Sequence, residues 1–386
     1  MRNADKNISS TDTPSADRGT IRVLLAAGGT GGHVYPAIAI ADSLREMDEK
    51  ANIIFVGTKD RMEWTTVPKS GYNIKSVWIS GFHRRLTIQN LLFPLKLIVS
   101  LIQSYFILRS FRPGAVVACG GFASGPVAWV AAKIGIPLIL QEQNSFPGAT
   151  NRMLAKHAAV IFTAFEDAQN YFPKEKIKLS GNPVRSQLQT INRKAGLDHF
   201  DFVPGEKVLM ILGGSGGALA INNAVENNLD VLHNGLGLQI IWQCGKKYYE
   251  QLSSSVQPKK YPNLRLLHFI EDMASAYAAA DLVITRAGAS TCSELMLLGQ
   301  PAVFVPSPNV AGNHQEKNAR SMVKAGAAEL LKEENLDNSL TEIIEKLITD
   351  RKQLEQMSKA MKKLAKPEAA NTIAKEVYTI AERKEE

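Results

Sequence analysis

Cysteine is scarce in this chain, and the cysteines that are present form no pattern. Only Cys119, Cys244 and Cys292 occur among 386 residues, so the number is odd, the spacing is wide and there is no C-x-x-C pair. Neither a disulfide framework nor a cysteine-based zinc site is therefore indicated. Unpaired cysteines of this kind are typical of a protein in a reducing cytosol.

The amino-terminal segment lacks the apolar centre that a secretory signal peptide needs. Residues 1–20 are polar and rich in Ser, Thr, Asp and Asn. We expect them to form a disordered tail.

Acidic residues are fewer than basic ones, which gives a formal net charge of +8 at pH 7. Such a balance favours an acidic partner, and phosphate groups, an anionic membrane surface or a nucleic acid would each provide one. The sequence contains no RNA- or DNA-binding signature and no motif of interleaved basic and aromatic residues, so nucleic acid is not expected as a partner. Charge alone does not decide between the other two.

Short apolar runs, in contrast, are frequent, and helix-length segments or glycine turns separate them. In the first half the runs occupy residues 21–27, 52–56, 74–79, 115–118, 137–140 and 160–163. In the second half they occupy residues 207–212, 238–242, 264–269, 282–285 and 301–305. Alternation of this kind predicts parallel sheets with helices on both faces. A chain of this length also exceeds one ordinary core, which favours two domains.

The two halves open with the same local sequence. Residues 28–32 read Gly-Gly-Thr-Gly-Gly, and residues 213–217 read Gly-Gly-Ser-Gly-Gly. Each follows a predicted strand and precedes a predicted helix. The repeat predicts an α/β protein made of two similar, doubly wound, Rossmann-like domains that face one another.

We place the border between these domains at residues 181–185, where Pro183 interrupts regular structure. The expected organisation is a tail over 1–20, a first domain over 21–185, a second domain over 186–366 and a terminal helix over 367–386. The terminal helix begins at Pro367 and is expected to pack back toward the first domain.

A strongly apolar segment over residues 88–108 predicts an amphipathic helix and not a membrane span. Pro94 suits its first turn. Polar residues interrupt one side, namely Lys96, Ser100 and Gln103. Apolar residues line the other side, namely Leu91, Leu95, Ile98, Ile102 and Tyr105.

Two compatible interpretations of this helix stay open. The helix packs against the first sheet, or the surface at its start lies on an anionic bilayer. The residues that we assign to membrane association combine apolar side chains with neighbouring arginines: Phe82, Arg84, Arg85, Leu86, Leu91, Leu92 and Phe93.

The first glycine loop differs from a dinucleotide-binding fingerprint. Rossmann loops read G-x-G-x-x-G and pair with an acidic residue at the end of the next strand, whereas this loop reads GGTGGH and the second strand ends at Val-Gly-Thr58. A nicotinamide enzyme is therefore not favoured. His33 at the loop-helix junction either hydrogen-bonds the backbone or a phosphate, or acts as a general base toward a sugar hydroxyl, because its unperturbed pKa is close to working pH.

A second candidate site follows the predicted strand at 282–285. The sequence from Arg286 to Glu294, RAGASTCSE, passes from a strand through small residues into a helix. The free backbone N–H groups at such a helix start attract anions such as a diphosphate. The alternative is a capping box of Thr291 and Glu294, which closes the helix start without any ligand.

Several motifs occur together in an order and spacing that resemble one family. They are residues 28–33 (GGTGGH), 141–144 (QEQN), 181–185 (GNPVR), 213–215 (GGS), 286–289 (RAGA) with Glu294, and His314 with Gln315. The chain is similar to the MurG family, N-acetylglucosaminyltransferases that convert lipid I into lipid II in peptidoglycan synthesis. The similarity runs from residue 21 to the carboxyl-terminal helices.

This resemblance implies a GT-B architecture, in which an acceptor domain and a UDP-GlcNAc domain face a central cleft. By position in the family's motifs, Glu294 would hold the ribose hydroxyls and Ile270 would meet the uracil through its backbone. The other residues expected to bind UDP-GlcNAc are Thr30, Gly31, Gly32, Asn144, Arg185, Ser215, Ala289, Ser290, Thr291, Cys292, Ser293 and Gln315.

The implied reaction is a single displacement with inversion. The C4 hydroxyl of the muramoyl unit of lipid I (undecaprenyl-pyrophosphoryl-MurNAc-pentapeptide) attacks UDP-GlcNAc, and we choose His33 as its base. No Asp-x-Asp pair occurs in the sequence, so we expect no metal and no other cofactor. The expected location is the cytoplasmic face of the inner membrane, as a peripheral protein, with other cell-wall synthesis and division proteins as further partners.

Three alternatives share parts of this pattern. The first is a glycosyltransferase of the same fold that acts on another lipid, such as diacylglycerol; the blocks at 28–33 and 141–144 disfavour it. The second is a UDP-sugar epimerase, which would need no basic apolar surface. The third is an idle module that binds the nucleotide without transferring a sugar.

Overall fold

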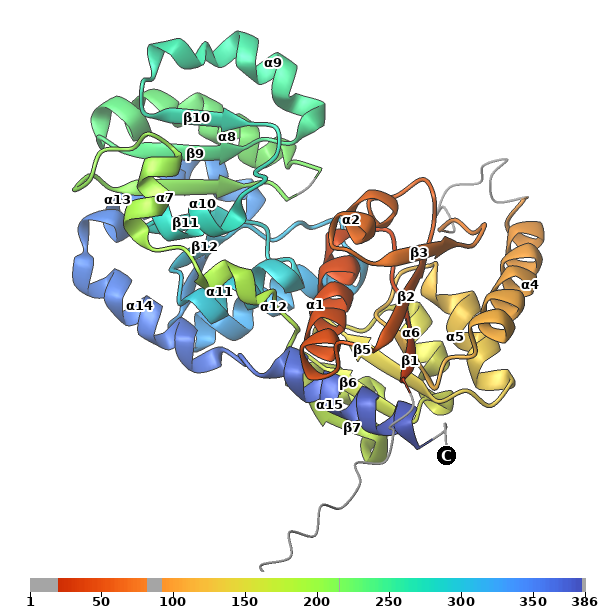
Figure 1. Cartoon of the computed structure of the whole chain (residues 1–386). Helices are drawn as coiled ribbons and strands as arrows, with labels where there is room; N and C mark the ends of the chain where they lie inside the picture. The colour runs from red at the N-terminus through yellow and green to blue at the C-terminus, as the bar shows by residue number, and fades with distance from the viewer. Residues whose placement is uncertain (1–19, 82–91, 215, 384–386) are drawn as a thin grey trace, which may run out of the picture.

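The computed structural model describes residues 20–81, 92–214 and 216–383. All of the expected tail except Thr20 lies outside the described residues. Ser215 lies outside them too, as do five residues assigned to membrane association: Phe82, Arg84, Arg85, Leu86 and Leu91. The described chain forms two α/β bodies, which Figure 1 shows beside each other.

The first body is built on a sheet of seven parallel strands in the order β3-β2-β1-β4-β5-β6-β7. β1 pairs with both β2 and β4, so the direction of winding reverses beside β1. Open sheets bind ligands at such a reversal, outside the carboxyl ends of the strands. The strands are β1 (Arg22–Ala26), β2 (Asn52–Gly57), β3 (Asn73–Ser76), β4 (Ala115–Ala118), β5 (Leu138–Glu142), β6 (Val160–Thr163) and β7 (Ile177–Leu179).

Helices cover both faces of this sheet. One buried cluster joins the strands to α1, and another joins them to α5 and α4. The α-helices are α1 (Gly31–Met47), α2 (Glu63–Lys69), α4 (Phe93–Phe111), α5 (Ser124–Lys133) and α6 (Ala149–Leu154). Short 3-10 turns occur at η1 (Ala155–His157), η2 (Glu166–Tyr171) and η3 (Lys174–Lys176).

The second body repeats this plan with six parallel strands in the order β10-β9-β8-β11-β12-β13. The strands are β8 (Val208–Leu212), β9 (Gln239–Gln243), β10 (Leu264–Leu267), β11 (Leu282–Thr285), β12 (Ala302–Phe304) and β13 (Ala328–Leu330). All residues of β8, β9 and β11 are buried. Strands buried on both faces are mostly apolar, which is why these segments stand out in the sequence, although β9 begins and ends with the buried Gln239 and Gln243.

The helices of the second body also lie on both faces of its sheet, over two buried clusters. They are α7 (Arg193–His199), α8 (Leu219–Asp230), α9 (Lys246–Val256), α10 (Met273–Ala279), α11 (Ala289–Leu298), α12 (His314–Lys324), α13 (Leu336–Thr349) and α14 (Arg351–Leu364). Shorter turns are η4 (Ser186–Gln189), the π-helical η5 (Val231–Gly235), η6 (Pro258–Lys260), η7 (Ala311–Asn313) and η8 (Glu333–Asn335). The predicted fold of two doubly wound parallel-sheet domains is confirmed.

The last helix, α15 (Ala369–Glu382), packs on the first body, although the preceding helices belong to the second (Figure 1). It contacts α1, and its buried residues Ile373 and Val377 join the core around β1. The chain therefore crosses between the bodies twice. The two crossings touch, since a Cβ atom built on Gly181 would lie 2.3 Å from the Cβ of Lys366.

Helix α4 begins at Phe93 with Pro94 in its first turn, as predicted, but its orientation differs from the simple amphipathic picture. Ser100 and Ser104 are fully buried, whereas Ile98 and Ile102 are about half exposed. The serine hydroxyls donate to helix carbonyls within α4, at 2.8 Å to Leu97 and 2.6 Å to Ser100. Because the two serines satisfy their own hydroxyls within the helix, they lie on the side that packs on the core with Leu97, Leu101 and Leu108, whereas Ile98, Ile102 and Phe106 face outward. Among the helices of the described segments, none combines the length and the apolar character needed to cross a membrane.

Candidate active site

Two helix starts, one from each body, meet at the interface. Helix α1 begins after the loop that follows β1, α11 begins after the loop that follows β11, and the two helices are in contact. A Cβ atom built on Gly32 would lie 3.9 Å from the Oγ of Ser290. No side chain caps either helix start. Backbone donors and the positive ends of two helix dipoles therefore lie close together, which suits a diphosphate.

The capping-box interpretation of Thr291 and Glu294 is wrong. Helix α11 begins at Ala289 with Gly288 as its N-cap, so Thr291 lies inside the first turn and Glu294 in the second. The Glu294 carboxylate instead accepts a hydrogen bond from the hydroxyl of Tyr277, at 2.9 Å. This leaves the start of α11 open.

His33 lies in the first turn of α1, and its Nδ1 is 3.2 Å from Oγ1 of Thr30, the N-cap residue. Burial lowers the pKa of His33 to about 4. A hydrogen bond with the Gly28 backbone and the charge of Glu63 act in the opposite direction, and the nearby His314 adds to the lowering. At neutral pH the ring is therefore an uncharged imidazole, which is the form that accepts a proton.

Glu294 is part of a buried cluster that joins both bodies. Arg185, from the crossing between them, places Nη2 3.8 Å from Oε1 of Glu294 and its guanidinium 4.2 Å from the ring centre of Tyr35 in α1. Burial raises the pKa of Glu294, whereas Arg185 and the hydrogen bond from Tyr277 lower it. The buried Nε of Arg185 has no hydrogen-bond partner among the described residues. The cluster thus keeps an unused donor beside an acid.

The predicted motif at 141–144 forms the end of β5 and a tight loop behind it. Glu142 is 2% exposed, and its carboxylate accepts from the backbone N–H groups of Asn144 and Gly148, at 3.0 and 3.1 Å, and from Nδ2 of Asn151, at 2.9 Å. Burial raises the pKa of Glu142, and these donors oppose the rise. Glu142 therefore fixes the loop that carries Asn144.

This loop also contacts the second body. The Ser145 N–H donates to Oδ1 of the buried Asn318 in α12, at 3.3 Å, and Nδ2 of Asn318 donates to the Ala287 carbonyl just before α11, at 3.2 Å. Next to it, Phe146 packs on Gly312, where a Cβ atom would lie 2.3 Å from the ring. Asn318 and Phe146 connect the loop after β5 to the segments that precede α11 and α12.

The other predicted donor-binding residues fall into two groups. Thr30, Gly31 and Gly32 form the start of α1, where Gly32 approaches Ser290, and Ala289, Ser290 and Thr291 form the first turn of α11. Gln315 lies in the first turn of α12, where its Oε1 accepts from the Ser307 N–H at 2.8 Å. The side chain of Cys292 is instead buried in the second core, and that of Ser293 donates to the Ala289 carbonyl. The N–H of Ile270 donates to Gln243 Oε1 at 2.9 Å.

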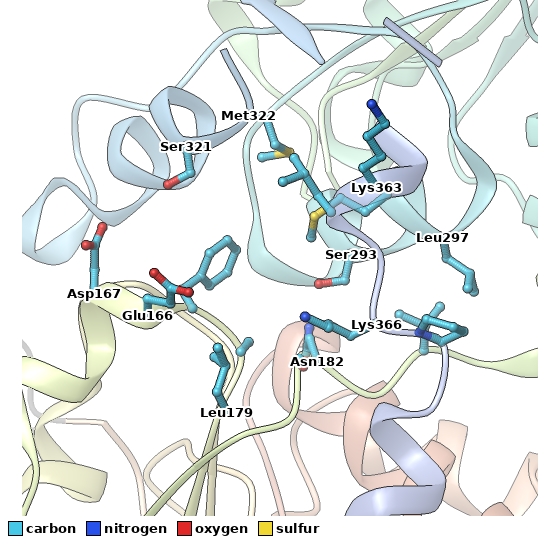
Figure 2. A pocket seen from close by; sticks show the side chains of 17 residues that line it. Glu166, Asp167, Leu179, Asn182, Ser293, Leu297, Ser321, Met322, Lys363 and Lys366 are labelled. Atoms are coloured by element: carbon cyan, nitrogen blue, oxygen red, sulfur yellow. The ribbon is translucent and has the colours of Figure 1, made fainter. Parts of the chain in front are cut away.

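A cavity of about 350 Å³ lies where the two crossings meet the bodies, and Figure 2 shows its lining. Ser293 is the only predicted donor-binding residue in that lining, which also contains Asn182, Met322 and Lys366. The cavity lies on the side of α11 that carries Ser293 and Leu297, away from Glu294. It is therefore distinct from the place where the two helix starts meet.

No cluster of three or more His, Cys, Asp or Glu side chains that would hold a metal ion is found among the described residues.

The sequence prediction missed four side chains that shape this site, namely Glu63, Tyr35, Tyr277 and Asn318. Glu63, Tyr277 and Asn318 reach the site from helices without a marked motif, and Tyr35 lies just beyond the GGTGGH motif, so their long-range contacts reveal them.

Two doubly wound domains with open helix starts facing each other define the class of the protein: it has the GT-B architecture. The glycosyltransferase family 28 N-terminal domain matches residues 23–163, and the glycosyltransferase family 28 C-terminal domain matches residues 208–373.

Relatives in other bacteria carry one name, UDP-N-acetylglucosamine–N-acetylmuramyl-(pentapeptide) pyrophosphoryl-undecaprenol N-acetylglucosamine transferase. The protein of Flavobacterium psychrophilum is 45% identical over 94% of this chain and 98% of its own length. That of Bacteroides fragilis is 42% identical over 94% and 96%. The chain therefore belongs to glycosyltransferase family 28 and, within it, to the MurG family.

Solved structures agree with this assignment. MurG of Acinetobacter baumannii superposes with a TM-score of 0.71 at 29% identity, over 93% of this chain and 99% of that one. A UDP-GlcNAc 2-epimerase from Neisseria meningitidis reaches a TM-score of 0.66 at only 16% identity, over 93% and 100%. The second likeness is one of fold alone.

Proposed function

We propose that this protein transfers GlcNAc from UDP-GlcNAc to the C4 hydroxyl of the muramoyl unit of lipid I and so forms lipid II. The observation that carries this proposal is the meeting of two open helix starts, one beside a neutral His33 and the other beside the Glu294 and Arg185 cluster. The relatives' name points to the same donor and acceptor.

The reaction requires a base on one side of the sugar and charge stabilisation on the other. His33 takes the proton of the acceptor hydroxyl, whose oxygen forms a β bond to C1 of GlcNAc while the α bond from C1 to the diphosphate breaks. UDP leaves with the bonding electrons. The N–H groups at the start of α11 and the Arg185 guanidinium stabilise the charge that grows on the leaving diphosphate.

The donor's remaining groups meet residues with matching chemistry. Glu294 accepts hydrogen bonds from the ribose diol, a role in which it exchanges some of its contact with Tyr277 for contact with the nucleotide. Ile270 meets the uracil through its carbonyl, since its N–H is already bonded to Gln243. Asn144 and Gln315 bind the sugar, and Thr30 to Gly32 lie beside the phosphates.

The acceptor's lipid chain places this reaction at the cytoplasmic face of the inner membrane. The outward face of α4 supports this part of the proposal, because it presents large apolar side chains, with Phe106 65% exposed and Ile98 56% exposed. Its end carries the exposed Arg109 and Arg112, which suit an anionic surface. Leu92 and Phe93 lie at its start, and Leu92 is exposed. Other cell-wall synthesis and division proteins are further partners in this proposal.

A transfer assay with radioactive UDP-GlcNAc tests the function directly. The purified full chain is offered lipid I, diacylglycerol or no acceptor, and the label is followed into lipid and into free sugar nucleotide. Label in lipid II alone supports the proposal. Label in glycosylated diacylglycerol, conversion of UDP-GlcNAc to its epimer, or UDP binding without any turnover would each assign a different function.

A further inference from the structure

Glu63, the first residue of α2, is a fully buried carboxylate beneath the first glycine loop. Its Oε1 accepts from the N–H and Oγ1 of Thr58, at 3.0 and 2.9 Å, and its Oε2 accepts from the N–H of Gly29, at 3.1 Å. No ion pair found among the described residues includes it. A buried carboxylate without a cation is costly, so its hydrogen-bond donors must offset the lost hydration.

The backbone around Glu63 is shaped for this side chain. A Cβ atom on Gly28, after β1, would lie 2.8 Å from Oε1, and one on Gly57, at the end of β2, would lie 2.5 Å from Cγ of Glu63. Two glycines, one just after β1 and one at the end of β2, thus leave space that the carboxylate fills. A neutral amide could also accept hydrogen bonds from Thr58 and Gly29, so the negative charge of an acid requires another reason.

The turn that Glu63 holds leads directly to His33. Gly28 hydrogen-bonds the imidazole through its backbone, and Gly29 donates to Glu63. Two charged or titratable groups act on the imidazole: Glu63 from α2 favours its protonated form, and His314 from α12 disfavours it. Glu63 is the only one of these two that favours the cation formed when His33 accepts a proton.

We propose that Glu63 is a positioning residue for the transfer reaction, which fixes the Gly28-Gly29 turn and stabilises the His33 imidazolium through its negative charge. The inference rests on the proposed function, because it requires His33 as the base. The proton moves from the acceptor hydroxyl to the imidazole and stops there. The influence of Glu63 passes through the loop and through space in a poorly hydrated interior.

Two variants separate the charge from the geometry. Glu63→Gln keeps the length of the side chain and removes the charge, whereas Glu63→Asp keeps the charge and moves it away from the loop. We follow the His33 ring by NMR in the full-length, histidine-labelled protein from pH 8 down to pH 4.5. In Glu63→Gln we expect a smaller protonated fraction of the His33 ring at each acidic pH than in the parent, and a fall in kcat on the order of tenfold. In Glu63→Asp the protonated fraction should change in the same direction but by less.

Glu142→Gln is the matched control, because it also neutralises a buried carboxylate held by N–H donors in the same body, yet Glu142 has no part in the charge balance of His33. It should leave the titration of His33 unchanged. If Glu63→Gln lowers activity but leaves that titration unchanged, Glu63 is only structural and the proposal is overturned.

If Glu63→Gln does not fold, Glu63→Asp provides the test. An unchanged His33 titration together with an unchanged kcat in Glu63→Asp would also overturn the proposal. Absence of transfer to lipid I by the parent protein would overturn the proposed function instead, while the titration would still report whether Glu63 acts on His33.

Discussion

The starts of α1 and α11 share a construction and differ in their surroundings. Each follows a buried parallel strand and a glycine-containing loop, and neither has a side-chain cap. The start of α1 carries an uncharged His33 above the buried Glu63. The start of α11 is followed by Glu294, which faces Arg185 and Tyr277.

Under the proposed function, one backbone arrangement would serve two purposes. Both starts offer N–H donors to an anion, but the side chains within one turn of each start decide what else happens there. In the proposed reaction, those at α1 would take a proton and those at α11 would hold the nucleotide. The two starts should therefore respond to mutation in different kinetic parameters.

The comparison is tested most strongly at His33. Replacement of His33 by Ala should lower kcat by about 10²- to 10⁴-fold, the range for loss of a general base, and should leave UDP affinity unchanged because the α11 side is intact. Steady-state kinetics with lipid I and calorimetry with UDP check both parts. A raised acceptor KM with normal kcat would make His33 a binding residue instead.

On the α11 side, Glu294→Gln should weaken UDP binding by roughly ten- to a hundredfold, the value of a hydrogen bond to a charged group. The effect should appear mainly in the donor KM, in contrast to His33→Ala. Calorimetry with UDP measures it. Glu355→Gln is the control, because Glu355 pairs with Arg351 on the exposed face of α14 and should bind UDP normally. Equal affinity in Glu294→Gln and the parent would contradict a ribose-binding role.

The contact between the two bodies can be broken at Gly312. Gly312→Ala adds a Cβ atom that meets the Phe146 ring, and it does so at a residue whose φ of 63° disfavours a side chain. We expect the free energy of unfolding to fall by about 1–3 kcal/mol. Gly326→Ala isolates the backbone part of this cost, because Gly326 has φ of 70° and nothing within 4 Å of its added Cβ. Denaturant melts compare the two. If Gly312→Ala and Gly326→Ala lose the same free energy of unfolding, the contact with Phe146 does not contribute to stability.

The pH profile sharpens the difference in protonation. Because the pKa of His33 is lowered to about 4 from 6.5, kcat/KM should stay flat as pH falls from 8 to 6. Between these two pKa values His33 is mostly neutral in the native protein and mostly protonated in the unfolded chain. His33 therefore lowers the free energy of unfolding as pH falls from 6.5 toward 4. A decline of kcat/KM centred near pH 6.5 would show an unperturbed histidine. Thermal melts of the parent and His33→Gln at pH 7 and 5 check the second part.

The smallest effect on stability is expected on the outer face of α4. Ile102→Ser should change the free energy of unfolding by no more than about 0.5 kcal/mol, because Ile102 is 52% exposed. It should nevertheless reduce co-sedimentation with anionic vesicles. The neighbouring Leu101 packs on the first core, so Leu101→Ser should cost about 2 kcal/mol or more. Unaltered vesicle binding in Ile102→Ser would exclude this face from the membrane contact.

Sequence patterns predicted the features of this fold that are local. Strands buried on both faces, such as β8 and β11, are continuous apolar runs, and the glycine loops mark the helix starts at α1 and α11. The short strands β7 and β13 were not predicted. Each has only three residues, and two of the three in β7 are exposed, so neither produces a long apolar run.

The parts that escaped prediction depend on contacts between distant residues. Glu63 meets Gly29 across 34 positions and Asn318 meets Ser145 across 173, and no local pattern signals either pair. The orientation of α4 escaped for another reason. Apolar residues lie on both sides of this helix, with Leu97 and Leu101 packed on the core and Ile98 and Ile102 exposed. The buried Ser100 and Ser104 bond their own helix, so apolar periodicity alone does not indicate which side is buried.

The double crossing of the chain restricts how the bodies can move. Two connections that touch each other, at Gly181 and Lys366, restrict the relative motion of the bodies more than one flexible connection would. We expect this restriction to preserve the mutual position of His33 and Glu294.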